Sequence, residues 1–389
     1  MSKYQILGLN LVLILVVAMA LAACATAEPQ TVEKIVEVEK VVEVEKVVEV
    51  EKVVEVEKPV EKIVEKEVEK IVEKIVEVEP ERVKRELVFG GLGWDSALVQ
   101  NGVARYIVEH GYGYPTSQIE GQTVPLFQGL RKGDIDITME IWLPNQNAVW
   151  NEAVQAGEVI PVGRSLEDNW QSTFIVPGYV MDANPGLVSV QDLKNDEYKM
   201  LFAEADSGGK AVLIGCIAQW SCRAVNEGQL KAYDLEDHVE LRDPGTSGAL
   251  AAAIEGAYKR EEPILFYYWG PTKLASQLDM RPLAQPDPSE CPENDPVHGC
   301  EFPAAQIMIA MNTSLVDEAP ELIAFFRKWD WSAVNQLAAD GWYAENKDNY
   351  DSAEEAYSAT GVWYLKNNDG WKSWVPEDVL ANVEAALAQ

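Results

Sequence analysis

Histidine is scarce in this chain of 389 residues, which contains only three, and no two of them have the spacing of metal ligands. The sequence also lacks a G-x-S-x-G motif, a phosphate-binding loop and an H-E-x-x-H motif. These absences remove the usual signatures of hydrolases, nucleotide-binding proteins and metalloproteases. Asp95 and Glu140 could form an acid/base pair, but two carboxyl groups at separate strand ends are weak evidence in a chain with 64 acidic residues. We therefore predict a protein that is not an enzyme and that holds neither a metal nor a cofactor.

Basic residues are also few. The chain has 32 Lys and Arg against 64 Asp and Glu, which gives a formal net charge of −32. Because nucleic-acid binding depends on a basic surface that displaces counterions, we exclude nucleic acid as a partner. The hydrophobic content of 47% is normal for a globular protein, so a folded part is expected.

Tryptophan is absent before Trp94, although the chain has 12. The preceding region begins with Lys3 and an apolar run over residues 6–21, which is the shape of a secretory signal. Small residues then precede a lone Cys24, an arrangement that resembles the lipobox of bacterial lipoproteins. We predict a signal peptide over residues 1–24, lipidation of Cys24 and an extracytoplasmic protein anchored to the cell membrane. A signal anchor with an incidental cysteine is the alternative.

Residues 25–85 form a low-complexity segment of Val, Glu and Lys. Lysines recur every six residues over 40–58 and every four over 62–74. A period of six is not a heptad, and β-branched valine favours extended backbone. We predict a solvated, mostly extended stalk whose second half is compatible with helix through Glu and Lys on neighbouring turns. An oligomerising coiled coil is the alternative.

From residue 86 onward, short apolar runs alternate with segments of helical spacing. This alternation predicts layered α/β structure, and a part of about 300 residues favours two lobes over one core. We expect a first lobe over residues 86–175 and 303–389 and a second lobe over 176–302, with chain crossings near 173–179 and 270–305. The expected strands are 86–91, 135–142, 174–180, 211–214, 264–268 and 307–311; the expected helices are 96–110, a helix ending at 127–132, 147–156, 224–233, 247–259 and 321–329.

Three tryptophans interrupt regular structure. Trp142 closes a strand shortly before a proline, Trp220 lies between two cysteines, and Trp269 ends an aromatic run before Gly and Pro. Ligands in open α/β sheets bind outside the carboxyl ends of strands, so these indoles could face one cleft. Indole faces attract poorly hydrated cations such as quaternary ammonium ions. Core packing is the alternative for any single tryptophan.

The segments around these tryptophans resemble a known family. Residues 140–144 (Glu-Ile-Trp-Leu-Pro), 215–222 (Gly-Cys-Ile-Ala-Gln-Trp-Ser-Cys) and 267–272 (Tyr-Tyr-Trp-Gly-Pro-Thr) are similar, in this order along the chain, to segments of the glycine betaine and proline betaine binding proteins of ABC importers. The resemblance covers nearly everything from Glu86 to the C-terminus. It implies a two-lobed periplasmic-binding-protein type II fold with a hinge and an interlobe cleft.

By the same resemblance, Trp142, Trp220 and Trp269 match the aromatic box that holds the trimethylammonium group in the family. Trp94 follows the first expected strand and could add a fourth wall; a packing role is the alternative.

The resemblance also implies how a ligand carboxylate is held. In the family, backbone N–H groups just after the middle tryptophan bind it, here those of Ser221 and Cys222, together with a side chain that is often His and is here Gln146. Two departures concern this end of the ligand. Gln219-Trp220-Ser221 replaces the usual Gly-Trp-Gly, and Gln146 cannot carry the positive charge of a histidine.

Export to an oxidising compartment allows the remaining four cysteines to pair. Cys216 and Cys222 enclose the Trp220 loop, and Cys291 and Cys300 enclose a proline-containing loop, so we predict one disulfide within each pair. Crossed pairing is the alternative and would tie distant segments together.

These observations predict an extracytoplasmic receptor that binds glycine betaine or a related quaternary ammonium compound and delivers it to the permease of an ABC transporter. One alternative is a receptor of the same fold for choline, carnitine or another polar amino compound. Another is a stalked surface protein that binds carbohydrate through its tryptophans.

Overall fold

The computed structural model of the chain describes residues 84–292 and 298–389. The predicted signal peptide, Cys24 and nearly all of the predicted stalk lie outside these residues and stay predictions. Within the two described ranges, the length and apolar character needed to cross a membrane are found in none of the helices.

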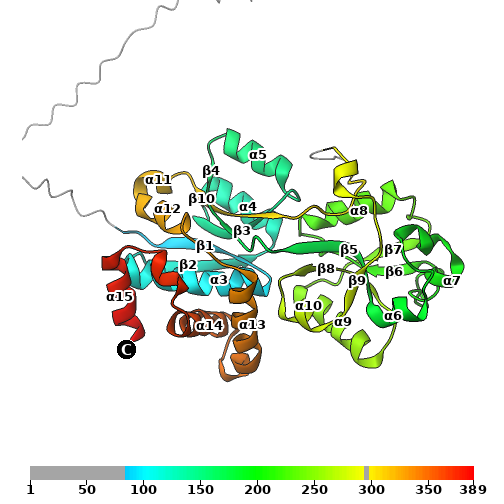
Figure 1. Ribbon diagram of the computed structural model, residues 1–389. Helices are drawn as coiled ribbons and strands as arrows, with labels where there is room; N and C mark the ends of the chain where they lie inside the picture. Colours follow the sequence, from blue (N-terminus) through cyan, green and yellow to red (C-terminus); the bar gives the residue numbers. More distant parts are fainter. Residues whose placement is uncertain (1–83, 293–297) are drawn as a thin grey trace, which may run out of the picture. The chain divides into compact units, whose positions relative to one another are not determined.

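Two five-stranded sheets organise the described part of the chain (Figure 1). Their strand orders are β2-β1-β3-β10-β4 and β7-β6-β8-β5-β9. In the first sheet β1 is parallel to β2 and β3 while β10 is antiparallel to its neighbours, and β5 has the same antiparallel role in the second sheet. The predicted α/β class is confirmed. The strands are β1 (Leu87–Leu92), β2 (Thr116–Gly121), β3 (Ile137–Leu143), β4 (Val159–Ser165), β5 (Trp170–Pro177), β6 (Ala211–Ile214), β7 (Val239–Arg242), β8 (Leu265–Gly270), β9 (Met280–Pro282) and β10 (Gln306–Asn312).

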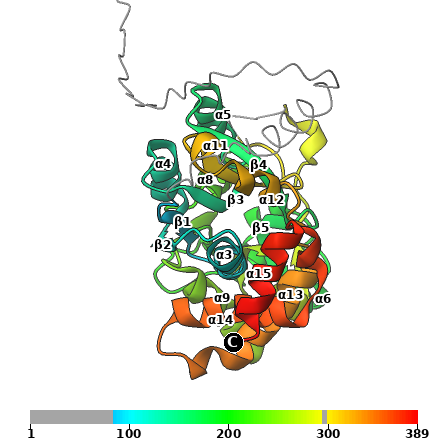
Figure 2. The same ribbon diagram turned by 90° about the vertical axis from the view of Figure 1, so that its left-hand side faces the viewer.

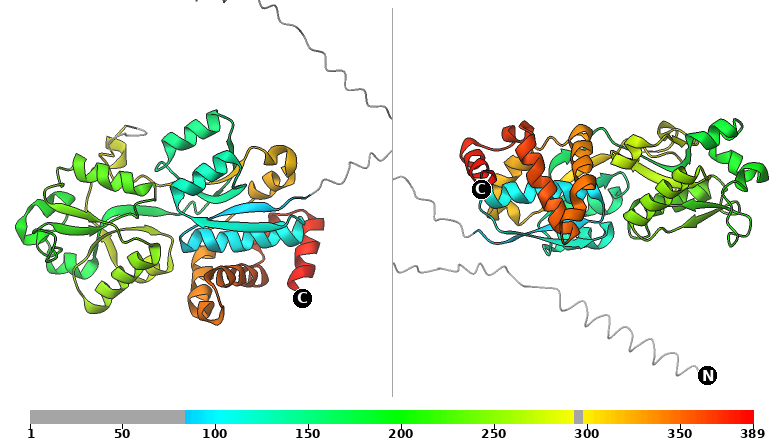
Figure 3. Two further views of the ribbon diagram at one scale, coloured as in Figure 1. Left: turned by 180° about the vertical axis from the view of Figure 1, so that it is seen from behind. Right: turned by 90° about the horizontal axis from the view of Figure 1, so that it is seen from below.

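Helices cover both faces of each sheet; we call a sheet with its covering helices a lobe. In the first lobe α4, α5, α11 and α12 lie on one face and α3, α13, α14 and α15 on the other (Figures 1 and 2). In the second lobe α8 lies on one face and α6, α9 and α10 on the other (Figures 1 and 3). The helices are α3 (Asp95–Tyr106), α4 (Thr123–Lys132), α5 (Asn147–Gln155), α6 (Gly178–Ala183), α7 (Asp196–Lys199), α8 (Cys222–Ala232), α9 (Ser247–Arg260), α10 (Lys273–Gln277), α11 (Leu315–Glu318), α12 (Pro320–Phe326), α13 (Ala333–Asn346), α14 (Ala353–Asn367) and α15 (Glu377–Leu387).

The C-terminal helices, which the sequence analysis did not assign, pack on the first lobe through glycines. A Cβ at Gly102 of α3 would lie 2.5 Å from the carbonyl oxygen of Tyr357 in α14, and a Cβ at Gly361 of α14 would collide with the Gly102 backbone. The two helix backbones therefore approach too closely for any side chain. This contact fixes α3, whose first turn lies beside the candidate site.

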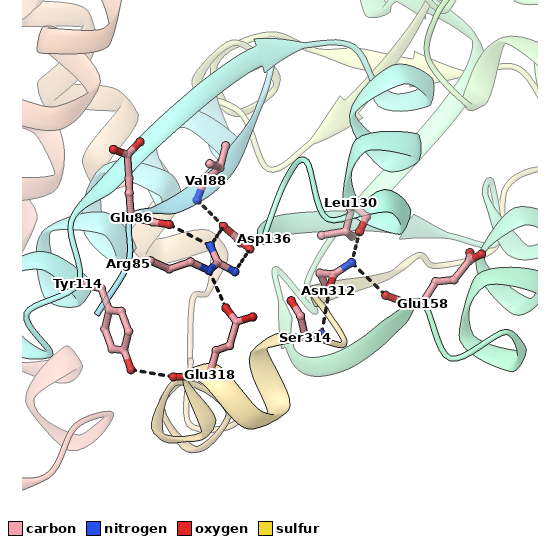
Figure 4. Close-up of polar contacts among 10 residues, drawn as sticks. All are labelled: Arg85, Glu86, Val88, Tyr114, Leu130, Asp136, Glu158, Asn312, Ser314 and Glu318. Atoms are coloured by element: carbon pink, nitrogen blue, oxygen red, sulfur yellow. Dashed lines mark hydrogen bonds and ion pairs between the residues drawn. The ribbon is translucent and has the colours of Figure 1, made fainter. Parts of the chain in front are cut away.

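The amino-terminal end of β3 is held by a buried carboxylate (Figure 4). Asp136, immediately before β3, accepts hydrogen bonds from the Arg85 guanidinium at 2.7 and 2.8 Å and from the Val88 backbone N–H at 2.8 Å. Arg85 also pairs with Glu318, at 2.6 Å. These bonds hold the start of β3 against β1, at the end of the strand opposite to Trp142.

The chain crosses between the lobes twice. It leaves β4 at Ser165 and begins β5, already in the second sheet, at Trp170. The crossing predicted at 173–179 is therefore wrong in position, because Ile175 pairs with both Phe266 and Pro282 of the second sheet. The return lies between β9 and β10, inside the predicted range 270–305. The predicted lobe boundary at 175 likewise falls inside β5 and not before it, while the boundary at 302 falls in the return between β9 and β10.

One side chain joins the two crossings. The Asn169 amide donates to the carbonyl oxygens of Leu166, at 2.7 Å, and Ala305, at 2.8 Å, and accepts from the Ala305 N–H at 3.1 Å. Leu166 has a left-handed backbone with φ of 47°. The two connecting segments are thus tied to each other where they pass between the lobes.

Candidate ligand-binding site

A pocket lies at the carboxyl ends of strands from both sheets, beyond β1 and β3 on one side and beyond β6 and β8 on the other. This is where ligands bind in open α/β sheets. The structure brings together here all seven residues predicted to contact a ligand. The lining residues are Trp94, Thr123, Trp142, Asn145, Gln146, Gln171, Trp220, Ser221, Cys222, Tyr267 and Trp269.

Four indoles form the aromatic end of the pocket. The ring centroids of Trp94 and Trp220 are 5.1 Å apart with an interplanar angle of 73°, and those of Trp220 and Trp269 are 5.1 Å apart at 81°. Trp142 completes the set from the end of β3. Each of the four is only 6 or 7% exposed. The ring planes of neighbouring indoles are steeply inclined to one another, and the rings are almost inaccessible to water. Such an arrangement can surround a compact cation with ring faces.

A buried carboxylate holds the two indoles of the first lobe. Glu140 Oε2 accepts hydrogen bonds from Trp94 Nε1 at 2.7 Å and Trp142 Nε1 at 2.9 Å, while its Oε1 accepts from Gln100 Nε2 at 2.7 Å. Burial raises the pKa of Glu140, and these hydrogen bonds act against that rise. Asp95 instead accepts from the Tyr357 hydroxyl at 2.6 Å. The two carboxyl groups considered as an acid/base pair are thus engaged with different partners.

Trp220 is anchored across the cleft. Its Nε1 donates to Gln122 Oε1 at 2.6 Å, and Gln122 immediately precedes α4 of the first lobe. A second bond between the lobes runs from the Ser247 hydroxyl, in α9, to the Gly93 carbonyl oxygen at 2.7 Å. The hydrogen bond of the Trp220 indole therefore requires that the two lobes approach each other.

Both predicted disulfides, Cys216–Cys222 and Cys291–Cys300, are present in the structure. The first closes the loop that carries Trp220. The Cys216 N–H donates to Asn226 Oδ1 at 2.7 Å, which attaches this loop to α8.

The polar end of the pocket offers unused hydrogen-bond donors. In the part of the chain that the structure describes, the backbone N–H groups of Ser221 and Cys222 donate to no protein acceptor. They lie at the N-terminus of α8, where free N–H groups and the helix dipole favour negative charge. Gln146 is 5% exposed, and its side-chain amide forms no hydrogen bond with another described residue. No charged side chain is among the described lining residues.

An amide pair that the sequence analysis missed links the two lobes beside this end. Asn145 Nδ2 donates to Gln171 Oε1 at 3.0 Å, and the Tyr267 hydroxyl donates to the same oxygen at 3.3 Å. Burial raises the pKa of Tyr267, so its hydroxyl remains a donor. Asn145 immediately follows the segment 140–144, and Tyr267 begins the segment 267–272, so both could have been included. Gln171 and Thr123 carry no signal in the sequence.

The described residues contain no candidate metal site. In residues 84–292 and 298–389, no group of three or more His, Cys, Asp or Glu side chains is arranged to hold a metal ion.

Comparison with known proteins identifies the family and the fold. Residues 85–360 match the model of the family described as the substrate binding domain of ABC-type glycine betaine transport system. The glycine betaine/proline betaine-binding periplasmic protein of Escherichia coli (strain K12) is 22% identical over 275 residues, which are 66% of this chain and 78% of that protein.

Two solved structures share the fold. The glycine betaine/L-proline-binding protein of an ABC transporter from Borrelia burgdorferi has a TM-score of 0.61 at 22% identity, covering 77% of this chain and 99% of that chain. An ABC-transporter choline binding protein in complex with choline has a TM-score of 0.61 at 19% identity, covering 78% and 98%. These likenesses show a two-lobed periplasmic-binding-protein type II fold. The family match over residues 85–360 establishes that the chain belongs to the substrate-binding domains of ABC-type glycine betaine transport systems, a family of receptors rather than of enzymes.

Proposed function

We propose that this protein binds glycine betaine or a related quaternary ammonium compound in the described pocket and delivers it to the permease of an ABC importer, for uptake of an osmoprotectant. The observation that carries the proposal is the composition of the pocket. Four buried indoles contributed by both lobes adjoin a polar end with unused N–H donors. A zwitterion with a trimethylammonium group and a carboxylate has one group for each end.

At the aromatic end, Trp94, Trp142, Trp220 and Trp269 would surround the trimethylammonium group. Such a cation is poorly hydrated, so little hydration is lost when it enters a dry pocket, and cation–π attraction is strongest where water is excluded. At the polar end, the N–H groups of Ser221 and Cys222 and the amide of Gln146 would bind the carboxylate. Donors at a helix N-terminus can bind an anion without a cationic side chain.

Choline is the second candidate, and one observation favours it. No cationic side chain lies among the described residues at the polar end, and the amide of Gln146 can donate to or accept from a hydroxyl as readily as it donates to a carboxylate. The choline-binding protein with the same fold shows that this architecture accommodates that ligand.

Isothermal titration calorimetry with glycine betaine, choline, carnitine and glucose tests the proposal. We expect heat from glycine betaine and none from glucose. Binding of choline without glycine betaine would select the second candidate, and binding of sugar alone would support the carbohydrate-binding alternative. Gln146→Ala tests the polar end of the pocket: the bound ligand should lose affinity by several-fold, because one hydrogen-bond partner is removed.

The position outside the cytoplasm is part of the proposal. Lipidation of Cys24 would anchor the protein, and residues 25–85 would serve as the tether. Metabolic labelling with a fatty acid should mark the native chain and leave a Cys24→Ser variant unlabelled. If the native chain is not labelled, the lipidation proposal is wrong and the signal-anchor alternative is favoured.

A further inference from the structure

The strongest feature that the proposed function does not use is Glu140. Its side chain is 1% exposed and is not among the pocket-lining residues, so it lies behind the aromatic wall. We propose that Glu140 is a positioning residue that determines specificity. Its carboxylate accepts the indole N–H groups of Trp94 and Trp142 and so fixes two walls of the pocket. As a result, the site selects a cationic ligand group over an uncharged group of the same shape. This inference rests on the proposed function.

The hydrogen-bond pattern identifies Glu140 as an acceptor. Oε2 receives the N–H groups of Trp94 and Trp142, at 2.7 and 2.9 Å, and an indole nitrogen can only donate. Oε1 receives Gln100 Nε2, at 2.7 Å. The orientation of Gln100 is itself fixed, because its oxygen accepts from the Trp329 Nε1, at 3.1 Å, and from the Ser165 hydroxyl. Both carboxyl oxygens therefore face donors, as the anionic form requires.

The charge of this carboxylate has no basic partner in the protein. None of the ion pairs formed by the described residues includes Glu140, whereas the buried Asp136, just before β3, is paired with Arg85. A buried anion without a counterion is costly unless it is strongly hydrogen-bonded, so the site gains when a cation enters nearby. The ligand's ammonium group would supply that cation.

Two effects would act on ligand choice. First, the bonds to Glu140 fix the planes of Trp94 and Trp142, so the ring faces are oriented before a ligand arrives. Second, donation of an indole N–H to an anion increases the electron density of the ring, and the anion itself attracts a cation through a medium of low dielectric constant. An uncharged tert-butyl group would keep the contact with the rings and lose both electrostatic terms.

The test compares glycine betaine with 3,3-dimethylbutanoate, the carboxylate in which a carbon atom replaces the quaternary nitrogen. In the full-length protein, Glu140→Gln should reduce the ratio of the two affinities by about tenfold or more. The matched control is Asp136→Asn, which neutralises a buried carboxylate at the other end of β3 (Figure 4) and should leave the ratio unchanged. Equal weakening of both ligands by Glu140→Gln, or no change, would overturn the proposal.

Glu140→Asp provides a second variant, because it keeps the charge and should retain more of the discrimination than Glu140→Gln. If Glu140→Gln does not fold, Glu140→Asp decides the question. The proposal is refuted if this variant has altered Trp94 and Trp142 N–H resonances and yet the same ratio of glycine betaine affinity to analogue affinity as the native protein. Nuclear magnetic resonance of ¹⁵N-labelled tryptophan reports those two bonds directly. Failure of the native protein to bind glycine betaine would instead refute the proposed function, so the two failures are distinguishable.

Discussion

The two sides of the aromatic pocket are built differently. On the first lobe, Trp94 and Trp142 donate to Glu140, which belongs to the same lobe. On the second lobe, Trp220 donates to Gln122 on the opposite side of the cleft. The walls from the first lobe are therefore oriented by that lobe alone, whereas the hydrogen bond of the Trp220 indole forms only with both lobes in contact. Ligand binding that favours contact between the lobes would complete the pocket at the same time.

Removal of a first-lobe wall should have the largest effect. Trp142→Ala should weaken glycine betaine binding by about 2 kcal/mol or more, because a desolvated cation–π contact is lost. Trp142→Phe should be milder, since it keeps a six-membered aromatic ring and loses only the five-membered ring with its N–H group. Calorimetry measures both. An unchanged affinity in a folded Trp142→Ala variant would contradict the role of Trp142 in the box.

The contact between Asp340 and Lys273, which also joins the two lobes, should respond to pH. Asp340 of α13 accepts from Gln336 Nε2 at 2.6 Å and from the Lys273 backbone N–H of α10 at 3.2 Å. Burial, assisted by the negative charge of Asp95, raises the pKa of Asp340 to about 7. The native state therefore binds this proton more tightly than the unfolded chain does. Acidification from pH 8 to pH 5 should add stability on the order of 2 kcal/mol through this group, and the gain should be lost as the pH rises through 7.

Urea unfolding of the native protein and Asp340→Asn at both pH values measures this contribution as a difference between the two proteins. The difference in the free energy of unfolding should shift in favour of the native protein on acidification. The same pH dependence in both proteins would show that Asp340 does not titrate in this range.

The loop that carries Trp220 gives the next largest effect. Paired replacement of Cys216 and Cys222 by serine should lower glycine betaine affinity about tenfold, which is about 1.4 kcal/mol, because the loop presents both the indole and the N–H donors. The same replacement of Cys291 and Cys300 is the matched control and should leave affinity unchanged. Equal losses from both pairs would indicate that the first disulfide has no specific role in the site.

The bond across the cleft should have the smallest effect. Gln122→Met removes the acceptor of the Trp220 N–H and should cost about 1 kcal/mol of ligand affinity, as expected for a lost hydrogen bond. Because Gln122 does not line the pocket, the loss should come from weaker contact between the lobes. Small-angle scattering should then show less compaction on ligand addition than in the native protein. If Gln122→Met compacts on ligand addition as much as the native protein does, Trp220 is positioned by its own lobe.

The sequence predicted central strands far better than edge strands. The six predicted strands correspond to β1, β3, β5, β6, β8 and β10, although β5 was placed several residues too late. The four that were missed, β2, β4, β7 and β9, are the outer strands of the two sheets. Central strands are covered on both faces and appear as apolar runs, whereas edge strands carry polar residues that give no such run. The residues of β2, for example, are all half-buried or exposed.

The candidate site divides in a similar way. The tryptophans and the disulfide loop were found because they lie in contiguous segments with unusual composition. Glu140 was noticed only as an acidic residue near a strand end, and Gln122, Gln171 and Thr123 were not noticed at all. Their place in the site depends on which strand ends meet, and single amide residues give no local pattern.

By itself, the sequence determined the α/β class, the three tryptophan segments and the pairing of cysteines close along the chain. These features follow from local apolar patterns and short separations, which one stretch of residues can encode. Only the tertiary structure decided that Glu140 bonds two indoles 46 and 2 residues away, and that Trp220 reaches Gln122, 98 residues earlier in the chain. The reason is that a hydrogen-bond partner is selected by the packing of whole lobes, and the residue type alone specifies only that a partner is needed.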